Sequence, residues 1–193
     1  PWAGQNLADL GAEVIKVERP KAGDDSRAFG PPWVKDRDGR DTKDSAYFTS
    51  ANRGKKSITV NISSAAGQAI VRDLARGADV LIENYKFGDL ARYGLGYDDL
   101  IALNPRLIYC SVTGFGQTGP YRERPGYDFM IQGMGGMMSV TGDAQGEPMR
   151  AGASTFPHNA SNAAGAAAAD STAAERTPRR VPWVSSAFQR SRR

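Results

Sequence analysis

The fold of this chain is set by residues 5–20, QNLADLGAEVIKVERP. Leu7 and Leu10 follow helical spacing, and Gly11 is the residue type that commonly ends a helix. The segment Glu13–Glu18 is short and rich in β-branched residues, which predicts a buried strand with polar ends. The proline that closes the stretch forces the chain out of regular structure. We therefore expect a helix followed directly by a buried strand.

Two further apolar runs repeat this plan, at Ala78–Tyr85 and Arg106–Thr113. Each run passes into polar or glycine-rich residues at its C-terminal end. This pattern is typical of parallel strands in an open α/β sheet, where ligands bind beyond the carboxyl ends of the strands. The sequence therefore predicts an α/β fold with a mostly parallel sheet and flanking helices.

The remaining segments fit this architecture. Lys21–Asp44 is polar and rich in Gly, Pro and Asp, which predicts a long surface excursion. Ser63–Arg76 places Ile70 and Leu74 at helical spacing, and a glycine follows it. We expect residues 57–85 to form a β–α–β unit.

Charge is distributed unevenly along the 193 residues, whose net charge is +4. Residues 1–152 contain 19 Lys and Arg against 19 Asp and Glu, so the remaining 6 basic and 2 acidic residues carry the whole excess. A neutral body gives no reason to expect a nucleic-acid-binding face. One cysteine, Cys110, and one histidine, His158, favour neither a disulfide nor a metal site. We expect a soluble protein of a reducing compartment, the cytoplasm, without membrane segments.

The two ends of the sequence look different from its middle. The chain enters at a predicted helix without an initiator Met, and a preceding strand would be needed to complete the sheet. We therefore interpret residue 1 as an internal position of a longer protein. Residues 153–193 contain 11 Ala, 6 Arg and 6 Ser but no Leu, Ile, Met or Tyr. Such a tail has too little to bury, so we expect it to be disordered, or loosely helical at Ala163–Ala174.

The abrupt change after Gly152 has a second interpretation. Alanine- and arginine-rich sequence of this kind arises when a GC-rich gene is read out of frame. We predict an insertion or deletion of one or two bases near the codons for residues 150–156. The chain then divides into a partial α/β domain, residues 1–152, and a tail, residues 153–193, that does not continue it.

Polar groups follow the predicted strand ends, and these are the candidate site residues. Arg19 follows the first strand, Asn84 and Tyr85 follow the second with Arg92 close behind, and the pair Tyr127–Asp128 follows the third. Taken singly, each arginine is a solvated or helix-end charge, and each tyrosine is simple packing. Converging on one sheet edge, they predict a site for an extended, phosphorylated ligand. GxxxxGK[ST] is absent, and the Gly114–Gly119 loop, which has the GxGxxG spacing, is by itself equally consistent with a plain turn, so no nucleotide fingerprint supports this alone.

Six motifs make the chain resemble the family III CoA-transferases over residues 1–152. They are PWAGQNLADLGAEVIKVERP, GDDSRAFGPP, NRGKKSITVNI, DVLIENYKFGDLARYGLGYDDL, NPRLIYCSVTGFGQTGPY and RPGYDFMIQGMGGMMSVTG. The family contains formyl-CoA transferase, carnitine CoA-transferase and succinate–hydroxymethylglutarate CoA-transferase, and the chain is most similar to the last. The resemblance implies a Rossmann-like large domain, a smaller second domain, and a homodimer of interlocked rings for the intact parent.

The resemblance also assigns roles to residues of this sequence. It implies coenzyme A as a substrate, brought as acyl-CoA, with no permanently bound cofactor and no metal. The implied CoA contacts are Arg19, Val60, Asn84, Tyr85 and Arg92. The implied neighbours of the acyl group are Tyr127 and Asp128.

The family's chemistry depends on an aspartate that attacks the acyl-CoA thioester. An anhydride and then an enzyme thioester form, and the acceptor acid repeats the cycle. Pro157 stands where this aspartate is expected, so we predict that no catalytic residue is retained and that this chain is inactive. One alternative is a non-catalytic remnant that binds part of CoA. The other is a racemase of the same fold, but racemases carry a histidine where this sequence has Tyr127.

Overall fold

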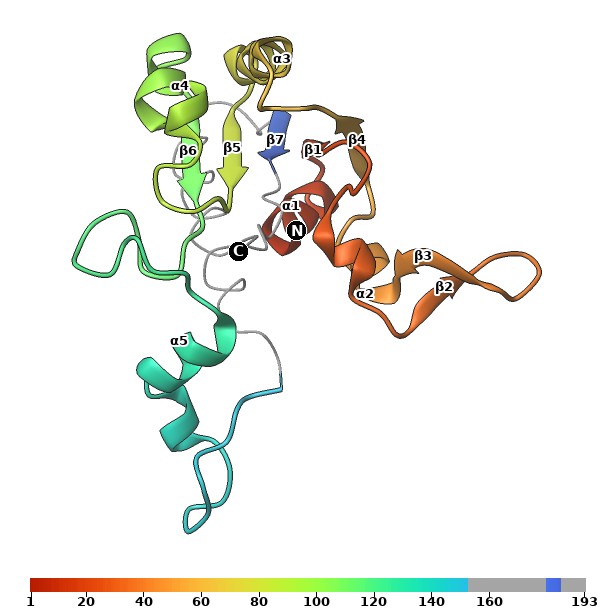
Figure 1. Ribbon diagram of the computed structural model, residues 1–193, viewed down its shortest axis with the longest axis vertical. Coiled ribbons are helices and arrows are strands. Elements are labelled where there is room, and N and C mark those ends of the chain that lie inside the picture. Colours follow the sequence, from red (N-terminus) through yellow and green to blue (C-terminus); the bar gives the residue numbers. More distant parts are fainter. Residues whose placement is uncertain (153–179, 185–193) are drawn as a thin grey trace.

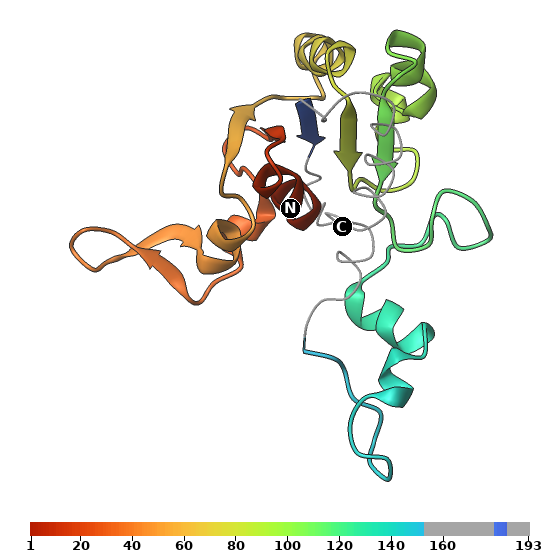
Figure 2. The same cartoon turned by 180° about the vertical axis from the view of Figure 1, so that it is seen from behind.

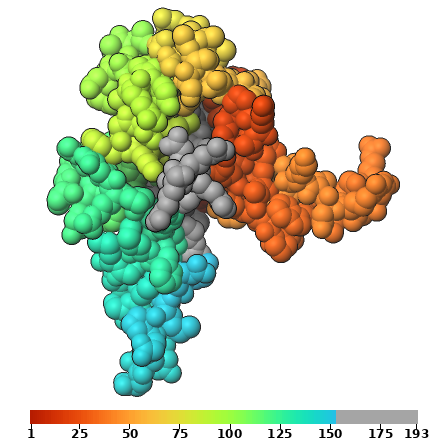
Figure 3. All heavy atoms as spheres, viewed as in Figure 1, coloured from red at the N-terminus to blue at the C-terminus, as the bar shows by residue number. Residues whose placement is uncertain are grey.

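The computed structural model of the protein describes residues 1–152 and the backbone of residues 180–184. Figure 1 shows a body in which helices flank a parallel sheet, and two limbs that project from this body. The view from behind in Figure 2 shows the same division. The limbs also stand out as separate lobes in the space-filling view (Figure 3). The candidate site residues lie on both the body and one limb.

The opening helix and strand form as the sequence predicts. Helix α1 spans Trp2–Asp9, and Gly11 follows with a φ of 93°, a left-handed value that glycine adopts at little cost. Strand β1 then covers Glu13–Glu18. Because Gly11 turns the chain so tightly, the helix packs directly against the strand that it precedes.

The main sheet has five strands, and every pairing between them is parallel. In spatial order they are β4 (Lys55–Thr59), β1, β7 (Arg180–Val184), β5 (Val80–Glu83) and β6 (Ile108–Ser111). The chain moves from β1 outward to β4, crosses to β5, and then moves outward to β6. The order therefore reverses between β1 and β5, which is where open α/β sheets bind ligands.

Strand β7 corrects part of the prediction for the tail. Its five residues lie between β1 and β5, pairing with Glu13–Val17 on one side and with Ile82 and Glu83 on the other. Disorder or loose helix does not hold for these residues, because two strands that do not pair with each other offer their backbone groups to this position. The rest of the tail prediction, including the helix at Ala163–Ala174, lies outside the described residues.

Two apolar clusters hold the sheet to its helices. On one face, α3 (Ala65–Arg76) and α4 (Tyr97–Leu103) pack against Val17 and Leu81. On the other face, α1 packs against a second cluster that includes Val14, Val80 and Ile82. Alternate residues of β5 enter opposite clusters, as a strand buried on both faces requires.

The buried face of α3 is shifted by one position along the helix from the face that the sequence predicts. The residues that face the core are Gly67, Val71 and Ala75, whereas Ile70 is 47% exposed and Leu74 is half-buried. A Cβ at Gly67 would stand 1.9 Å from the carbonyl oxygen of Asn61, so the helix approaches the chain before it too closely for a larger residue. Gly67, Val71 and Ala75 therefore make the closest contact with the core. Leu74 packs at its edge, as the spacing predicts, and Ile70 is largely exposed.

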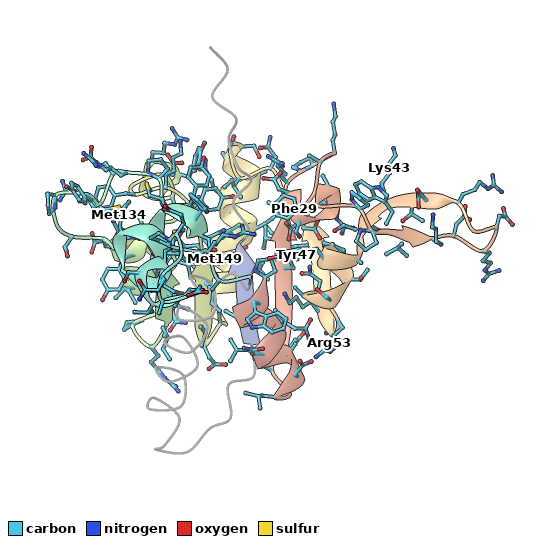
Figure 4. All side chains as sticks on the ribbon, turned by 90° about the horizontal axis from the view of Figure 1, so that it is seen from below. Phe29, Lys43, Tyr47, Arg53, Met134 and Met149 are labelled. Atoms are coloured by element: carbon cyan, nitrogen blue, oxygen red, sulfur yellow. The ribbon has the colours of Figure 1, made fainter. Side chains whose placement is uncertain are left out.

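The first limb is the excursion that follows β1. It contains the short helix η1 (Asp25–Ala28) and the antiparallel hairpin of β2 (Trp33–Lys35) and β3 (Asp41–Ser45), and it returns through α2 (Ala46–Ser50). Phe29 and Tyr47 lie next to each other at its base, with ring centroids 5.6 Å apart (Figure 4).

The second limb follows β6. It contains α5 (Asp128–Met134) and η3 (Met137–Val140), and it carries the exposed methionines Met134 and Met149 (Figure 4). A short helix, η2 (Ala91–Tyr93), lies between β5 and α4. None of the helices in the described part of the chain has the length and apolar character needed to span a membrane.

Candidate functional site

A buried ion pair anchors the first limb beneath the end of β1. The Lys16 side chain is 1% exposed; its Nζ contacts the Asp24 carboxylate and donates to Asn52 Oδ1 at 2.8 Å. The same Nζ lies 4.6 Å from the centroid of the Phe48 ring. Burial lowers the pKa of Lys16, and the Asp24 charge opposes that effect. This lysine therefore fixes the limb rather than meeting a ligand.

Glu18, the last residue of β1, is the second buried charge. It accepts two hydrogen bonds from Arg27, at 3.0 and 3.1 Å, one from Ser57 Oγ at 2.8 Å, and one from the Asp24 N–H at 2.9 Å. Burial alone would raise the pKa of Glu18, but Arg27, Ser57 and the Lys16 charge hold it below its usual value. The carboxylate is thus ionised and fully partnered.

Arg19 follows Glu18 and is partly exposed. Its Nε donates to the Gly23 carbonyl at 3.2 Å and its Nη2 pairs with Asp25. These contacts occupy one side of a guanidinium that has five N–H donors. The predicted CoA contact is therefore held in place by its own loop, with donors left for a ligand.

An open cavity of about 210 Å³ lies beside Arg19, between the ends of β1 and β4. Its lining consists of Glu18, Arg19, Lys21, Ala22, Gly23, Arg27, Ser57 and Thr59. Sites for complete small ligands usually measure 300–1,000 Å³. This cavity is smaller and polar, so it suits one charged group of a larger ligand, such as a phosphate.

Lys21 is a site residue that the sequence analysis missed. It is exposed at the rim of the cavity and has a φ of 65°. The other cations of the lining are paired, Arg19 with Asp25 and Arg27 with Glu18, and no ion pair of Lys21 occurs among the described residues. A lysine three residues beyond the strand was the only signal in the sequence, and it did not distinguish this residue from any surface lysine.

The second group of predicted residues follows β5. The Tyr85 N–H donates to Glu83 Oε2 at 2.7 Å, which folds Asn84 and Tyr85 into a turn at the strand end. Burial raises the pKa of the Tyr85 hydroxyl to about 12, the Glu83 charge adds to this, and the Arg19 charge acts in the opposite sense. Arg19 and Tyr85 therefore interact electrostatically across β7, the strand that separates β1 from β5.

Arg92 joins this group through Asp89. Its Nη2 lies 3.4 Å from Asp89 Oδ1, and its guanidinium lies 5.0 Å from the Tyr93 ring centroid. Asp89 also acts on the pKa of Tyr85. The arginine is half-exposed and, like Arg19, carries donors that these contacts do not use.

Val60 differs from the other predicted CoA contacts. Its side chain is 6% exposed and packs in the core cluster on the α3 face, and its N–H donates to the Glu18 carbonyl at 2.9 Å. A contact between Val60 and a ligand would therefore use the backbone.

The predicted acyl-site pair lies on the second limb. Tyr127 caps α5 and is 49% exposed, and Asp128 opens the helix and accepts a hydrogen bond from Gln132 Nε2 at 2.7 Å. Helix α5 lies beyond the carboxyl ends of β5 and β6, on the side toward which their arrows point (Figure 1). The pair thus lies beyond the carboxyl ends of the strands, on a different element from the predicted CoA contacts.

A glycine crossing sets where this limb leaves the body. A Cβ added to Gly114 would stand 2.2 Å from the Cα of Gly126, and the reverse substitution meets Gly114 equally closely. Only two glycines allow the backbones to cross at this distance. Pro157, at the position expected for the nucleophile, lies outside the described residues.

The comparisons with known proteins identify the family and the fold. The family model described as CoA-transferase family III matches residues 1–179. The chain belongs to CoA-transferase family III. The family match extends past residue 152, while the relatives below align over 152 residues, so a boundary at 152 stays a prediction.

The chain is 58% identical over 152 residues to succinate–glutarate CoA-transferase of Agrobacterium fabrum, covering 79% of this chain and 38% of that protein. It is 51% identical to human succinyl-CoA:glutarate CoA-transferase, covering 79% of this chain and 33% of the human protein. The chain therefore spans less than two-fifths of the length of these relatives.

Solved structures give the same result for the fold. A crystal structure of a CAIB/BAIF family protein from Brucella suis has a TM-score of 0.77 and 51% sequence identity, over 88% of this chain and 46% of that one. Rv3272 of M. tuberculosis has a TM-score of 0.75 and 34% identity, over 94% of this chain and 50% of that one. The open α/β fold predicted from the sequence is confirmed.

Proposed function

We propose that this chain is the CoA-binding part of an enzyme that transfers coenzyme A between an acyl-CoA and a free carboxylic acid. The observation that carries the proposal is that Arg19 and Tyr85 follow the carboxyl ends of β1 and β5, on either side of the place where the strand order reverses. Arg92 adds a second guanidinium there. Two arginines and an aromatic ring suit a ligand with phosphate groups and a flat base.

The small polar cavity adds a detail to this proposal. Lys21 and Arg19 line it with cationic groups, and Ser57 and Thr59 line it from β4. Its volume of about 210 Å³ suits one phosphate of CoA rather than the whole nucleotide. The rest of the ligand would then extend across the end of β5, toward Asn84 and Tyr85.

We propose succinyl-CoA as donor and a dicarboxylate such as glutarate as acceptor, because two relatives above 50% identity carry these names. In the intact parent, an aspartate attacks the thioester carbonyl and releases CoA thiolate, giving a mixed anhydride. The thiolate then attacks the aspartyl carbonyl and releases the donor acid. The acceptor carboxylate reverses these two steps and leaves as its CoA thioester. A cytoplasmic location and an interlocked homodimer of that parent belong to the same proposal.

Binding of CoA to the 193-residue chain tests the assignment by calorimetry. Arg19→Ala and Arg92→Ala should each weaken binding by about 1–3 kcal/mol, the range of charge-assisted hydrogen bonds. Arg40→Ala is the matched control, because Arg40 pairs with Asp38 on the hairpin limb, and its affinity should equal that of the unchanged chain. Unchanged affinity in both site variants rejects the assignment.

The same chain should bind CoA without transferring it, because Pro157 stands where the aspartate is expected. Incubation with succinyl-CoA and glutarate should yield no glutaryl-CoA. Turnover by the purified chain contradicts this expectation. Reading the DNA in another frame beyond codon 150 should restore an aspartate near position 157, and stop codons in every other frame would make the tail genuine.

A further inference from the structure

The end of β5 carries a buried carboxylate whose role the proposed function leaves open. Glu83 is 4% exposed, although the carboxyl ends of parallel strands are where ligands bind. Its backbone carbonyl accepts from the Val112 N–H at 2.8 Å, so it is fixed against β6 as well. Among the described residues its side chain belongs to no ion pair, which is unusual for a carboxylate removed from water.

The two oxygens of Glu83 hold two different loops. Oε2 accepts the Tyr85 N–H at 2.7 Å and so forms the turn that presents Asn84 and Tyr85. Oε1 accepts from the Ser111 hydroxyl, and Ser111 Oγ in turn accepts from Gln117 Nε2 at 2.6 Å. Gln117 belongs to the glycine loop that leaves β6. One carboxylate thus links both loops at this edge of the sheet.

We propose that Glu83 is a positioning residue, whose carboxylate fixes the Asn84–Tyr85 turn and the Gly114–Gly119 loop relative to each other for binding of CoA. The proposal rests on the proposed function for its ligand. The clamp itself rests on the hydrogen bonds alone, and it can be measured without CoA.

The surroundings of Glu83 disfavour its ionised form, so a charged carboxylate at this position needs a reason. Burial raises the pKa of Glu83, hydrogen bonds from Ser111 and the Tyr85 N–H oppose this, and the Asp89 charge adds to it. The titratable groups on neighbouring β6, Tyr109 and Cys110, bring no positive charge. Neutralising a carboxylate kept for packing alone would leave the groups around it in place, whereas neutralising one kept for its charge-assisted hydrogen bonds would loosen the groups that it holds.

Glu83→Gln separates these roles, since it removes the charge at nearly the same volume, keeps one acceptor oxygen for the Tyr85 N–H, and offers an N–H₂ that can donate to Ser111 Oγ. The folded-state pKa is raised, so the charge lowers stability above that pKa and has no effect below the ordinary value of 4.5. E83Q should therefore melt at the same temperature as the unchanged chain, or higher, at pH 7, with no gain at pH 4. The Tyr85 amide should nevertheless exchange about tenfold faster, because a neutral acceptor binds an N–H more weakly.

CoA binding by calorimetry completes the test, with E13Q as the matched control at the other end of a strand, where Glu13 pairs with Lys56. E83Q should weaken CoA binding about tenfold at pH 7, and E13Q should not. Gln117→Ala removes only the exposed end of the chain of hydrogen bonds; it should loosen the glycine loop without lowering the melting temperature.

The outcomes test two claims separately: that Glu83 positions the two loops, and that this positioning serves CoA binding. Unchanged Tyr85 exchange in E83Q, or a lowered melting temperature as its sole effect, overturns the positioning role. Faster exchange with unchanged CoA affinity overturns the link to CoA. If the unchanged chain binds no CoA, the proposed function fails, and the exchange rates still decide whether Glu83 holds the turn.

Discussion

Glu18 and Glu83 occupy equivalent places in the two halves of the sheet and behave in opposite ways. Each is the last residue of a parallel strand, and they are 3% and 4% exposed. Glu18 accepts a two-point contact from Arg27, and its pKa lies below the usual value despite burial. Within the described part of the chain, Glu83 accepts from a hydroxyl and a backbone N–H but from no cation, and burial raises its pKa.

The difference shows that burial alone does not decide the charge state of a strand-end carboxylate. A countercharge within hydrogen-bond reach does. The consequence for stability also has opposite signs. The lowered pKa of Glu18 stabilises the fold above the ordinary value of 4.5, and this is lost as pH falls through the folded-state pKa. The raised pKa of Glu83 instead costs stability as pH rises through its folded-state value.

Removing the countercharge is the strongest way to test this contrast. Arg27→Ala leaves Glu18 without its hydrogen-bonded guanidinium, although the Lys16 charge remains nearby. Breaking a buried pair costs about 3–5 kcal/mol, and because Arg27 is 32% exposed we expect a loss at the lower end of this range. Chemical denaturation should show this loss in the free energy of unfolding. The guanidinium also lies 3.8 Å from the Phe48 ring centroid, so some packing is lost with the charge.

Two further arginine variants make that result interpretable. Arg27→Lys keeps a charge but not the planar fork, so it should recover part of the loss. Arg53→Ala breaks an exposed pair with Asp9, 2.5 Å between Nη2 and Oδ2, and should cost at most about 1 kcal/mol. Equal losses in R27A and R53A would mean that burial of Glu18 has no energetic consequence.

Features of the fold that depend on neighbouring residues in the sequence could be predicted, whereas features that depend on distant residues could not. The runs that became β1, β5 and β6 were predicted correctly, because their apolar pattern and polar ends are local signals. Arg19 and Tyr85 were placed at one edge because parallel strands share a carboxyl end. The position of β7 was not foreseen, because the slot between β1 and β5 exists only once the strand order is known.

The buried charges were the other feature that sequence could not predict. Lys16 sits in an otherwise apolar strand and gives no sign that Asp24, eight residues later, folds back to meet it. The pairing of Glu18 with Arg27 and Ser57 depends on the same loop returning past β4. Such contacts are set by tertiary packing, whereas periodicity reports only which face of an element is covered.

Each of the two glutamates accepts a hydrogen bond from a serine hydroxyl, and removing these hydroxyls tests the difference between Glu18 and Glu83 by smaller changes. Ser111→Ala removes one of the two side-chain contacts of Glu83, and the loss should be about 1–3 kcal/mol at pH 7, as for an unsatisfied buried acceptor. Ser57→Ala removes the equivalent bond to Glu18, but Arg27 remains, so about 0.5–1.5 kcal/mol is expected. Urea denaturation of both variants measures the difference, and a larger loss in S57A would contradict the countercharge argument.

The reactivity of the Cys110 thiol depends on the charge of Glu83, and this is the smallest of the predicted effects. Cys110 is the single cysteine of the chain, and it pairs with Ile82 across the β5–β6 ladder. Burial raises the pKa of its thiol, and the Glu83 charge raises it further. Only the thiolate reacts with iodoacetamide, so E83Q should speed alkylation at pH 8 by a small factor, on the order of two.

Glu18→Gln is the control for this measurement, because Glu18 does not act on the Cys110 thiol. Its rate should match that of the unchanged chain, and in 8 M urea all three rates should be equal. Faster alkylation in both variants would indicate local opening of the sheet instead of a change in charge. An alkylation rate unaffected by E83Q would mean that the Glu83 carboxyl is already protonated at pH 8. Its folded-state pKa would then lie above 8, and Glu83 could not hold the two loops by its charge.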